Sequence, residues 1–297
     1  MTIPPGLTTR AMALDDAGAV TTLIAAEELH DIGEAVVEEA DIVSDWQRPS
    51  YEVGDSTLGV FDGDRLVAFA ELSGGDRAAA AVDPEYRGRG IGTHLAEWIQ
   101  DRARSRGLTV IGMPVPQGSP GDRLLESLGY RLRWTSWVLA LPEGRTIPVR
   151  PLPAGYSIRT ATESDCRAVW TVIEDAFLEW SVRDRQSFED FSAQVMQRPG
   201  FAPWNMRVVT DAAGEVVGAA VVLSADSTAF VEKLAVRKDQ RQQGLAQALL
   251  ADSFAQAGAH GATRSELSTD SRTGALTLYE KVGMEVTSTW VNRAIDL

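Results

Sequence analysis

The sequence predicts an α/β (α+β) fold made of two tandem domains, each a mixed, mostly antiparallel sheet flanked by helices. Three observations support this prediction. The chain has 297 residues, which is enough for two domains of ordinary size. Segments of the first half recur in the second half at a nearly constant spacing. Each half also alternates short β-type runs with amphipathic helical runs in the order β-α-β-β-β-α-β-α-β.

The internal repeat is the strongest of these observations. Arg10 and Asp16 recur 149 positions later as Arg159 and Asp165. A second set recurs at an offset of 154 positions: Val82 and Val236, Arg87 and Arg241, Gly90 and Gly244, Leu95 and Leu249, Gly107 and Gly261, Leu124 and Leu278, Glu126 and Glu280, Gly129 and Gly283. A constant offset over so long a stretch indicates a tandem duplication.

Proline content places the boundary between the copies. Residues 141–153 contain four prolines, which stiffen a chain and withhold hydrogen-bond donors from a sheet. We therefore expect an N-terminal domain at 1–140, a Pro-rich linker at 141–153 and a C-terminal domain at 154–297. Each domain then has a common single-domain size.

The elements follow the same order in both copies. Asp15 and Asp16 in the first copy and Ser164 and Asp165 in the second mark helix starts. Turns that contain Asp and Gly, at 62–64 and 211–214, indicate hairpins. The expected strands are 7–10, 58–61, 66–72, 77–82, 108–111 and 132–139 in the first copy, and 156–159, 206–210, 216–223, 229–236, 263–267 and 286–295 in the second. Short helices are expected at 122–127 and 274–281.

Charge and cysteine content exclude several functions. The chain carries 28 basic and 42 acidic residues, a net charge of −14, which is the wrong sign for a nucleic-acid partner or an anionic membrane surface. A small anionic ligand needs only a local site and is not excluded. A single cysteine, no apparent signal segment and no long apolar run together suggest a cytoplasmic protein. Three scattered histidines predict no metal site.

Residues 27–41 contain seven acidic side chains. Such a run is usually a solvated face of a helix or loop, which is our expectation here. Recognition of a cationic partner is the alternative.

The turn after the fourth strand of each copy predicts an anion site. The residues concerned are Val82, Arg87, Gly88, Arg89, Gly90, Ile91 and Gly92, and in the second copy Arg241, Gln242, Gln243, Gly244, Leu245 and Ala246. Free N–H groups at a helix start attract a pyrophosphate, and glycine lets the backbone approach it. The arginine is expected to add charge. The pattern G-x-G-x-x-G fails at Thr93, and no P-loop motif is present.

These turns resemble the (Gln/Arg)-x-x-Gly-x-(Gly/Ala) loop of the GNAT acyl-CoA N-acyltransferases. Residues 278–284 are similar to that family's Leu-Tyr-Glu-Lys-x-Gly-Phe segment. The resemblance covers both copies, and it implies acetyl-CoA as the donor, bound in a V-shaped opening between the fourth and fifth strands. It also implies direct attack of an amine on the thioester. In the second copy the cofactor and the oxyanion are then expected at the backbone of Leu234, Ala235 and Val236.

The second copy is expected to be the catalytic one. Period-two alternation places Glu232 on one strand face with Phe230, Leu234 and Val236, where burial would tune it as a general base; Glu266 is the competing carboxylate. The resemblance makes Tyr279 the general acid. The corresponding residues of the first copy are Ala78 and Leu125, so its chemistry is expected to be lost. Whether the first copy still binds CoA stays open.

The sequence says least about the acceptor substrate. Trp180 and Trp204 are expected at the acceptor wall, and a small-molecule amine is the expected substrate of a monomer or homodimer. The alternatives are acetylation of a cysteinyl amine as by mycothiol synthase, a peptide or protein N-acetyltransferase, and a non-catalytic acyl-CoA-binding module. Residues 268–272 depart from the Asn-bearing segment associated with mycothiol synthase.

Overall fold

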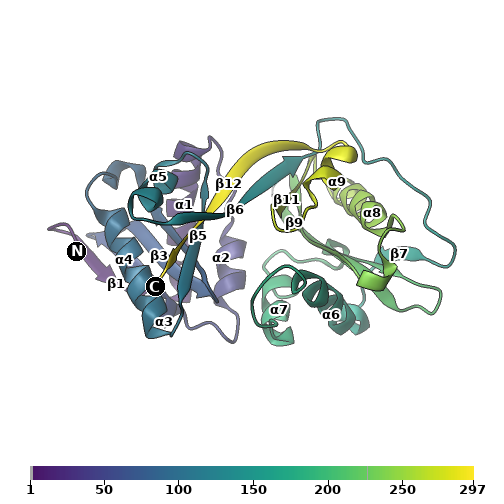
Figure 1. Cartoon of the computed structure of the whole chain (residues 1–297), viewed down its shortest axis with the longest axis horizontal. Coiled ribbons are helices and arrows are strands. Elements are labelled where there is room, and N and C mark those ends of the chain that lie inside the picture. The colour runs from purple at the N-terminus through teal and green to yellow at the C-terminus, as the bar shows by residue number, and fades with distance from the viewer. Residues whose placement is uncertain (1–2, 226) are drawn as a thin grey trace. The chain divides into compact units, whose positions relative to one another are not determined.

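The computed structural model describes residues 3–225 and 227–297, which form two compact units (Figure 1). Unit 1 contains the chain up to Thr135 together with Thr289–Leu297, and unit 2 is Ser136–Ser288. Each unit is a mixed sheet with helices on both faces, so the predicted fold class is confirmed. In the described residues, no helix has both the length and the apolar character needed to cross a membrane.

Unit 1 is built on six neighbouring strands in the order β1-β2-β3-β4-β5-β12. Its own strands are β1 (Thr8–Arg10), β2 (Thr57–Asp62), β3 (Arg65–Gly74), β4 (Arg77–Val82) and β5 (Val110–Pro116). Its helices are α1 (Ala17–Asp31), α2 (Glu39–Trp46), α3 (Val53–Ser56), α4 (Ile91–Ser105) and α5 (Pro120–Ser127). Neighbouring strands are antiparallel except β4 and β5, which run parallel.

Unit 2 repeats this arrangement in the order β6-β11-β10-β9-β8-β7. Its strands include β7 (Ser157–Thr160), β8 (Met206–Thr210), β9 (Val216–Ala225), β10 (Thr228–Val236) and β11 (Arg264–Asp270). Its helices are α6 (Cys166–Phe177), α7 (Phe188–Val195), α8 (Leu245–Ala259) and α9 (Leu276–Lys281). The parallel pair is here β10 and β11. The strands and helices therefore occur in the predicted order, within a few residues of the predicted bounds.

The closing strands differ from the prediction because the two copies exchange them. The C-terminal strand β12 (Glu285–Asp296) pairs antiparallel with β5, for example Val291 with Val115, and so completes unit 1. Strand β6 (Arg131–Ala140), which closes the first copy in sequence, pairs through its second half with β11 of unit 2. Alternating hydrophobicity specifies which face of a strand is buried, but it does not specify which of two related sheets the strand joins.

The Pro-rich segment at 141–153 is consequently not the connection between the units. It joins β6 to β7 within unit 2, and Ile147 is buried there in the same apolar cluster as Leu139 and Leu267. The side-chain amide of Gln247 also donates to the Pro148 carbonyl at 2.8 Å. The chain passes between the units inside β6 and β12 instead.

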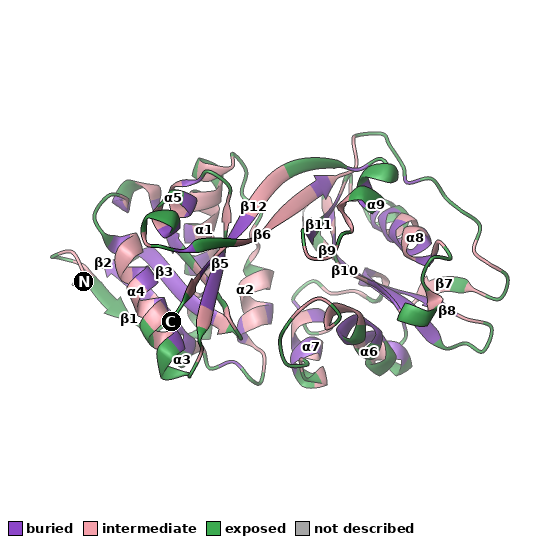
Figure 2. Ribbon diagram, viewed as in Figure 1, coloured by how far each residue is buried: buried purple, intermediate pink, exposed green. Residues whose placement is uncertain are grey.

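The central strands of each unit are largely buried (Figure 2). Alternation along these strands separates two apolar layers in each unit. In unit 1, Ala68 and Ala70 of β3 face α4, whereas Phe69 between them joins the layer of α1 and α2. In unit 2, Val222 faces α8 and Val221 faces α6 and α7. Burial of these side chains holds each sheet between its helices.

Candidate active site

The parallel strands of unit 2 part at their C-terminal ends. β10 and β11 are paired from Thr228 opposite Arg264 to Val231 opposite Leu267. Beyond this point no pairing between the two strands is found in the described residues. The last residues of β10 and β11 therefore flank an opening in the sheet. In unit 1 the parallel pairing is shorter still, with Arg77 opposite Gly112 as the one paired position in the part of the chain described.

Two backbone N–H groups of β10 face this opening. The N–H of Arg237 donates to the Val217 carbonyl at 2.8 Å and so points towards β9. Successive peptide groups of a strand point to opposite sides, so the N–H groups of Val236 and Leu234 point away from β9. Of the residues predicted for cofactor and oxyanion contacts, Leu234 and Val236 thus direct their N–H groups to the edge that β11 has left, whereas the N–H group of Ala235 points towards β9.

The turn after β10 forms a concave set of N–H groups. Gln242 and Gly244 both have left-handed backbones, with φ of 64° and 82°, directly before the 15-residue helix α8. Gly88 and Gly90 repeat this geometry before α4, with φ of 74° and 83°. Alternating left-handed residues aim successive N–H groups into one anion-binding concavity, and the helix start adds its dipole.

The glycines of these turns leave room for a ligand. A Cβ built on Gly90 or Gly244 meets no atom within 4 Å. Gly92, by contrast, is packed tightly, because a Cβ there would lie 2.7 Å from the Leu124 side chain. Gly90 therefore leaves space in which a ligand could approach the backbone, whereas Gly92 is packed in the first turn of α4.

The arginines of the turns are not free to neutralise an anion, contrary to the prediction. The Arg241 guanidinium is held by both oxygens of Glu179, at 2.6 and 3.0 Å. That of Arg87 is held by Asp31 at 2.7 and 3.0 Å. The periodicity of the turn could not reveal these carboxylates, because they lie some sixty positions earlier in the chain, at the end of α1 for Asp31 and just after α6 for Glu179.

The other residues of the turns anchor them. Ile91 and Leu245 are buried at the start of their helices, so each helix is fixed against its sheet. The Arg89 guanidinium lies 4.6 Å from the centre of the Tyr86 ring. Gln243 is exposed, with weak contacts to Gln240, and Ala246 is half-buried on the inner face of α8.

Glu232 is not the buried carboxylate that the alternation predicted. The register of β10 against β9 shifts between Val231 and Lys233, so Glu232 is the extra residue of a β-bulge. A bulge reverses the alternation downstream, and the apolar face consequently carries Val231 with Leu234 rather than Glu232. The Glu232 side chain is exposed and pairs with the Lys233 ammonium at 2.8 Å.

Glu266 is buried, but it lies in the paired part of β10 and β11 and not at the opening. It stands opposite Phe230, where β10 and β11 are still paired. Its carboxylate is held by the Arg264 guanidinium at 2.6 Å. Of the two carboxylates predicted as base, only Glu232 therefore lies where the strands separate.

Tyr279 is buried on α9 in the apolar layer of α8. Its hydroxyl makes no hydrogen bond to any of the residues described. Burial raises the pKa of Tyr279 to about 12, so the phenol is protonated at neutral pH and can donate a proton or a hydrogen bond. In unit 1 the corresponding Leu125 is buried and apolar, as is Ala78.

The two predicted tryptophans lie in different places. Trp180 directly follows Glu179, the partner of Arg241, and the Arg272 guanidinium lies 4.8 Å from the centre of its ring. Trp204 stacks on His260, with ring centres 4.4 Å apart, at the far end of α8. A 15-residue helix is about 22 Å long, so the structure does not bring Trp204 to the turn.

One side-chain pair at the end of β11 was not predicted from the sequence. Arg272 donates to both oxygens of the buried Asp270, at 3.1 and 2.5 Å, while its guanidinium covers Trp180. The pair thereby joins the end of β11 to the segment after α6. The Asp-x-Arg spacing was visible in the sequence, but only the fold reveals that it meets Trp180.

Comparison with known proteins agrees with this architecture. The model of the acetyltransferase (GNAT) family matches twice, at residues 24–130 and 166–284. Mycothiol acetyltransferases from Salinispora arenicola and Thermobispora bispora are 30% and 27% identical; the alignments cover 76% and 77% of this chain and 77% and 80% of those proteins. A solved GCN5-related N-acetyltransferase from Sphaerobacter thermophilus has a TM-score of 0.78 at 26% identity, covering 99% of this chain and 97% of that one.

The two matches fall one on each copy of the internal repeat, so the predicted family resemblance is confirmed for both copies. The solved relative aligns over nearly the whole length of both chains. The chain belongs to the acetyltransferase (GNAT) family, as an N-acetyltransferase with two GNAT domains in tandem.

Proposed function

We propose that this enzyme transfers an acetyl group from acetyl-CoA to a primary amine of a small molecule, and that the reaction takes place in unit 2. One observation carries the proposal. Unit 2 combines an open strand edge, a concave set of N–H groups and a protonated, unbonded phenol on the helix that follows β11. Unit 1 has the turn but neither the phenol nor a carboxylate at the position of Glu232.

The residues fit an acyl-CoA donor. The turn from Gln242 to Gly244 suits a pyrophosphate because it offers N–H groups without an obstructing side chain. The open edge of β10 offers the Val236 N–H to an amide carbonyl of an extended ligand, as one strand does for another. Acetyl-CoA, when bound, supplies an activated acyl carbon: the amine nitrogen bonds to it, the carbon–sulfur bond breaks, and the thiol leaves.

The chain's own groups assist this exchange at three atoms. The Leu234 N–H can donate to the acyl oxygen as negative charge develops there. The Glu232 carboxylate, exposed at the bulge, can take the amine proton directly or through water. We favour it over Glu266, which is engaged by Arg264 in the paired part of the strands.

Tyr279 acts on the leaving sulfur as a hydrogen-bond donor. Its pKa of about 12 exceeds that of an ordinary thiol, about 8.5, by some 3.5 units, so complete proton transfer would cost about 5 kcal/mol. A hydrogen bond to the developing thiolate avoids that cost and still stabilises the charge. Removal of the hydroxyl should therefore lower kcat by about 10- to 100-fold without abolishing it.

The acceptor has two candidate classes. A small-molecule amine would lie near Trp180 and the Asp270–Arg272 pair, which border the opening. The relatives named mycothiol acetyltransferases favour acetylation of the amine that those enzymes acetylate, as the second candidate. Acceptors of both classes, together with peptides, belong in one assay.

The test measures release of free CoA thiol from acetyl-CoA by the full chain against a panel of amines, cysteinyl glycosides and peptides. Activity with at least one small amine, reduced 10- to 100-fold in kcat by Tyr279→Phe, supports the proposal. Tyr130→Phe is the matched control, because Tyr130 is a buried tyrosine of unit 1. No release above background with any acceptor would refute the enzymatic proposal, and an unchanged Tyr279→Phe would remove Tyr279 from the mechanism.

A further inference from the structure

The two units present the same backbone donor at the end of the fourth strand of each copy. In unit 1 the N–H of Asp83 donates to the Val67 carbonyl at 3.0 Å, as Arg237 does to Val217 at 2.8 Å in unit 2. The preceding N–H, that of Val82 or Val236, therefore points to the side from which the next strand has departed. In the proposed function this is the donor that receives an amide carbonyl of CoA.

In unit 1 this donor already has an acceptor from the chain itself. The Val82 N–H donates to the Glu27 carboxylate at 3.2 Å. The same oxygen of Glu27 also accepts from the Arg87 guanidinium at 3.1 Å. Glu27 belongs to α1, so a helix of the same unit places a carboxylate over the open edge of β4.

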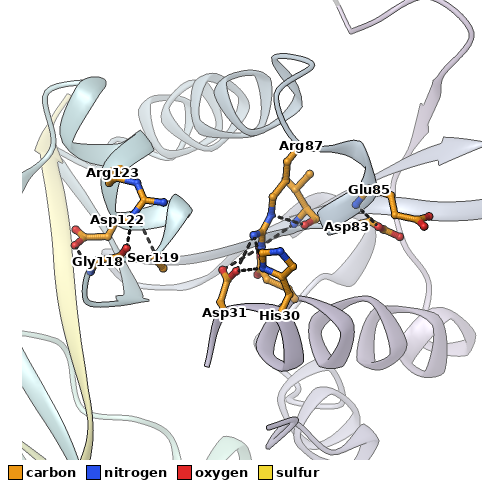
Figure 3. A network of polar contacts seen from close by, with 11 residues as sticks. His30, Asp31, Asp83, Glu85, Arg87, Gly118, Ser119, Asp122 and Arg123 are labelled. Carbon is orange, nitrogen blue, oxygen red and sulfur yellow. Dashed lines mark hydrogen bonds and ion pairs between the residues drawn. The ribbon is translucent and has the colours of Figure 1, made fainter. Parts of the chain in front are cut away.

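The Glu27 carboxylate is held in this position. Arg87, its partner, is fixed from the other side by Asp31, which also accepts from the His30 ring at 2.7 Å (Figure 3). The side chain of Glu27 is only 26% exposed. These contacts make the carboxylate part of the unit's structure rather than a mobile surface group, contrary to the solvated face predicted for residues 27–41.

Unit 2 differs at the corresponding helical position. The offset of 149 positions relates the start of α1 to the start of α6, and it makes Ala176 the counterpart of Glu27. A methyl group cannot accept a hydrogen bond. In residues 3–225 and 227–297 no acceptor for the Val236 N–H is found. The ion pair between Arg241 and Glu179, by contrast, corresponds to that between Arg87 and Asp31 in unit 1.

A CoA molecule would meet two obstacles in unit 1. Its amide carbonyl would have to displace the Glu27 side chain, whose oxygen the Val82 N–H and the Arg87 guanidinium already hold in place. Its phosphates would also approach Glu27 and Asp31, which repel them across a partly desolvated site. In unit 2 neither obstacle arises, because the Ala176 side chain has neither a hydrogen-bond acceptor nor a charge.

We propose that unit 1 is closed to CoA by its own Glu27, which occupies the Val82 N–H, so that each chain binds one CoA, in unit 2. The residue at this one helical position, glutamate in α1 and alanine in α6, decides which copy is open. The inference rests on the proposed function, because it takes acyl-CoA as the ligand of the open copy.

The test exchanges the two residues in the full chain and counts CoA by calorimetry, with circular dichroism to verify folding. The wild type should bind one equivalent of CoA. Glu27→Ala should add a second equivalent, and Ala176→Glu should weaken the first at least 100-fold. Ala176→Met, which adds bulk without an acceptor, is the control and should weaken binding by less than 10-fold.

Other outcomes separate this inference from the proposed function. Two equivalents in the wild type, or an unchanged affinity in Ala176→Glu, would overturn the closure of unit 1 and leave the proposed function standing. No binding by the wild type but one equivalent in Glu27→Ala would support the closure and refute the assignment of unit 2. If Glu27→Ala fails to fold, Glu27→Leu, which fills the same space, replaces it; folded Glu27→Leu without a second equivalent overturns the inference.

Discussion

The side chain of Arg241 donates from Nε to the backbone carbonyl of Val236 at 3.1 Å. The same bond joins Arg87 to Val82 at 3.3 Å. Each arginine thus reaches back over the residues before it to the last residue of the preceding strand. Because carboxylates take up both guanidinium charges, the arginines hold the shape of the N–H concavity rather than contribute charge to it.

The hydrogen bond from Arg241 to the Val236 carbonyl predicts that acetyl-CoA binding tolerates Gln at position 241 but not Ala. A Gln side-chain amide can still donate to the Val236 carbonyl, so Arg241→Gln should keep the Kd for acetyl-CoA within about 3-fold. Arg241→Ala loses a hydrogen bond worth about 1 to 1.5 kcal/mol and should raise the Kd about 10-fold. Calorimetry on both variants measures this. Equal losses of affinity in both variants would mean that the positive charge of Arg241, and not its hydrogen bond to Val236, supports binding.

The left-handed glycines predict an asymmetry between the copies. Alanine at φ near 82° costs about 1 to 2 kcal/mol of folding stability, so Gly244→Ala and Gly90→Ala should lower stability equally in urea titrations. Only Gly244→Ala adds a methyl group to the open site, and it should weaken acetyl-CoA at least 10-fold. A comparable loss in Gly90→Ala would place the bound CoA in unit 1 instead.

The pH dependence of stability should carry the signature of Glu27. Burial raises the pKa of Glu27 from 4.5 to about 7, so between these values the folded chain binds more protons than the unfolded chain, and stability falls as pH rises. Allowing for its partial exposure, the fall is on the order of 2 kcal/mol. Glu27→Gln, which does not titrate, should lack this component in urea titrations from pH 4 to 8.

The sign of that component separates it from ordinary ion pairs. Arg159 lowers the pKa of Asp165, so that pair contributes stability that is lost on acidification. A stability advantage of the wild type over Glu27→Gln that increases with rising pH would contradict the assignment.

Strand exchange predicts that the C-terminal strand stabilises unit 1. Ala294 and Val291 are buried in that unit opposite Gly112 and Val115. Deletion of residues 289–297 should therefore remove amide protection from β5 while leaving β10 and β11 protected, as measured by hydrogen exchange. Ala294→Asp is the point-mutant version, because it buries a charge in the same place. Loss of protection in β10 instead would contradict the exchange.

Sequence patterns over short stretches were sufficient to predict much of the fold of this protein. The duplication, the order of elements and the helix starts follow from spacing and periodicity, because they depend on residues near one another in the chain. The glycine positions follow too, since Gly90 and Gly244 stand where the backbone must be left-handed. The predicted base, by contrast, depended on unbroken alternation, and the bulge at Glu232 breaks it.

The sequence by itself determined that this chain is two copies of one acyltransferase-like domain, each with an anion-binding turn between a strand and a helix. Only the tertiary structure decided which strand closes which unit, where Trp204 lies and what Arg87 and Arg241 hold. Those outcomes depend on contacts between residues far apart in sequence. The one glutamate over the edge of β4 shows the difference: in the sequence it is one of seven acids in a charged run, and in the fold its carboxylate accepts the Val82 N–H.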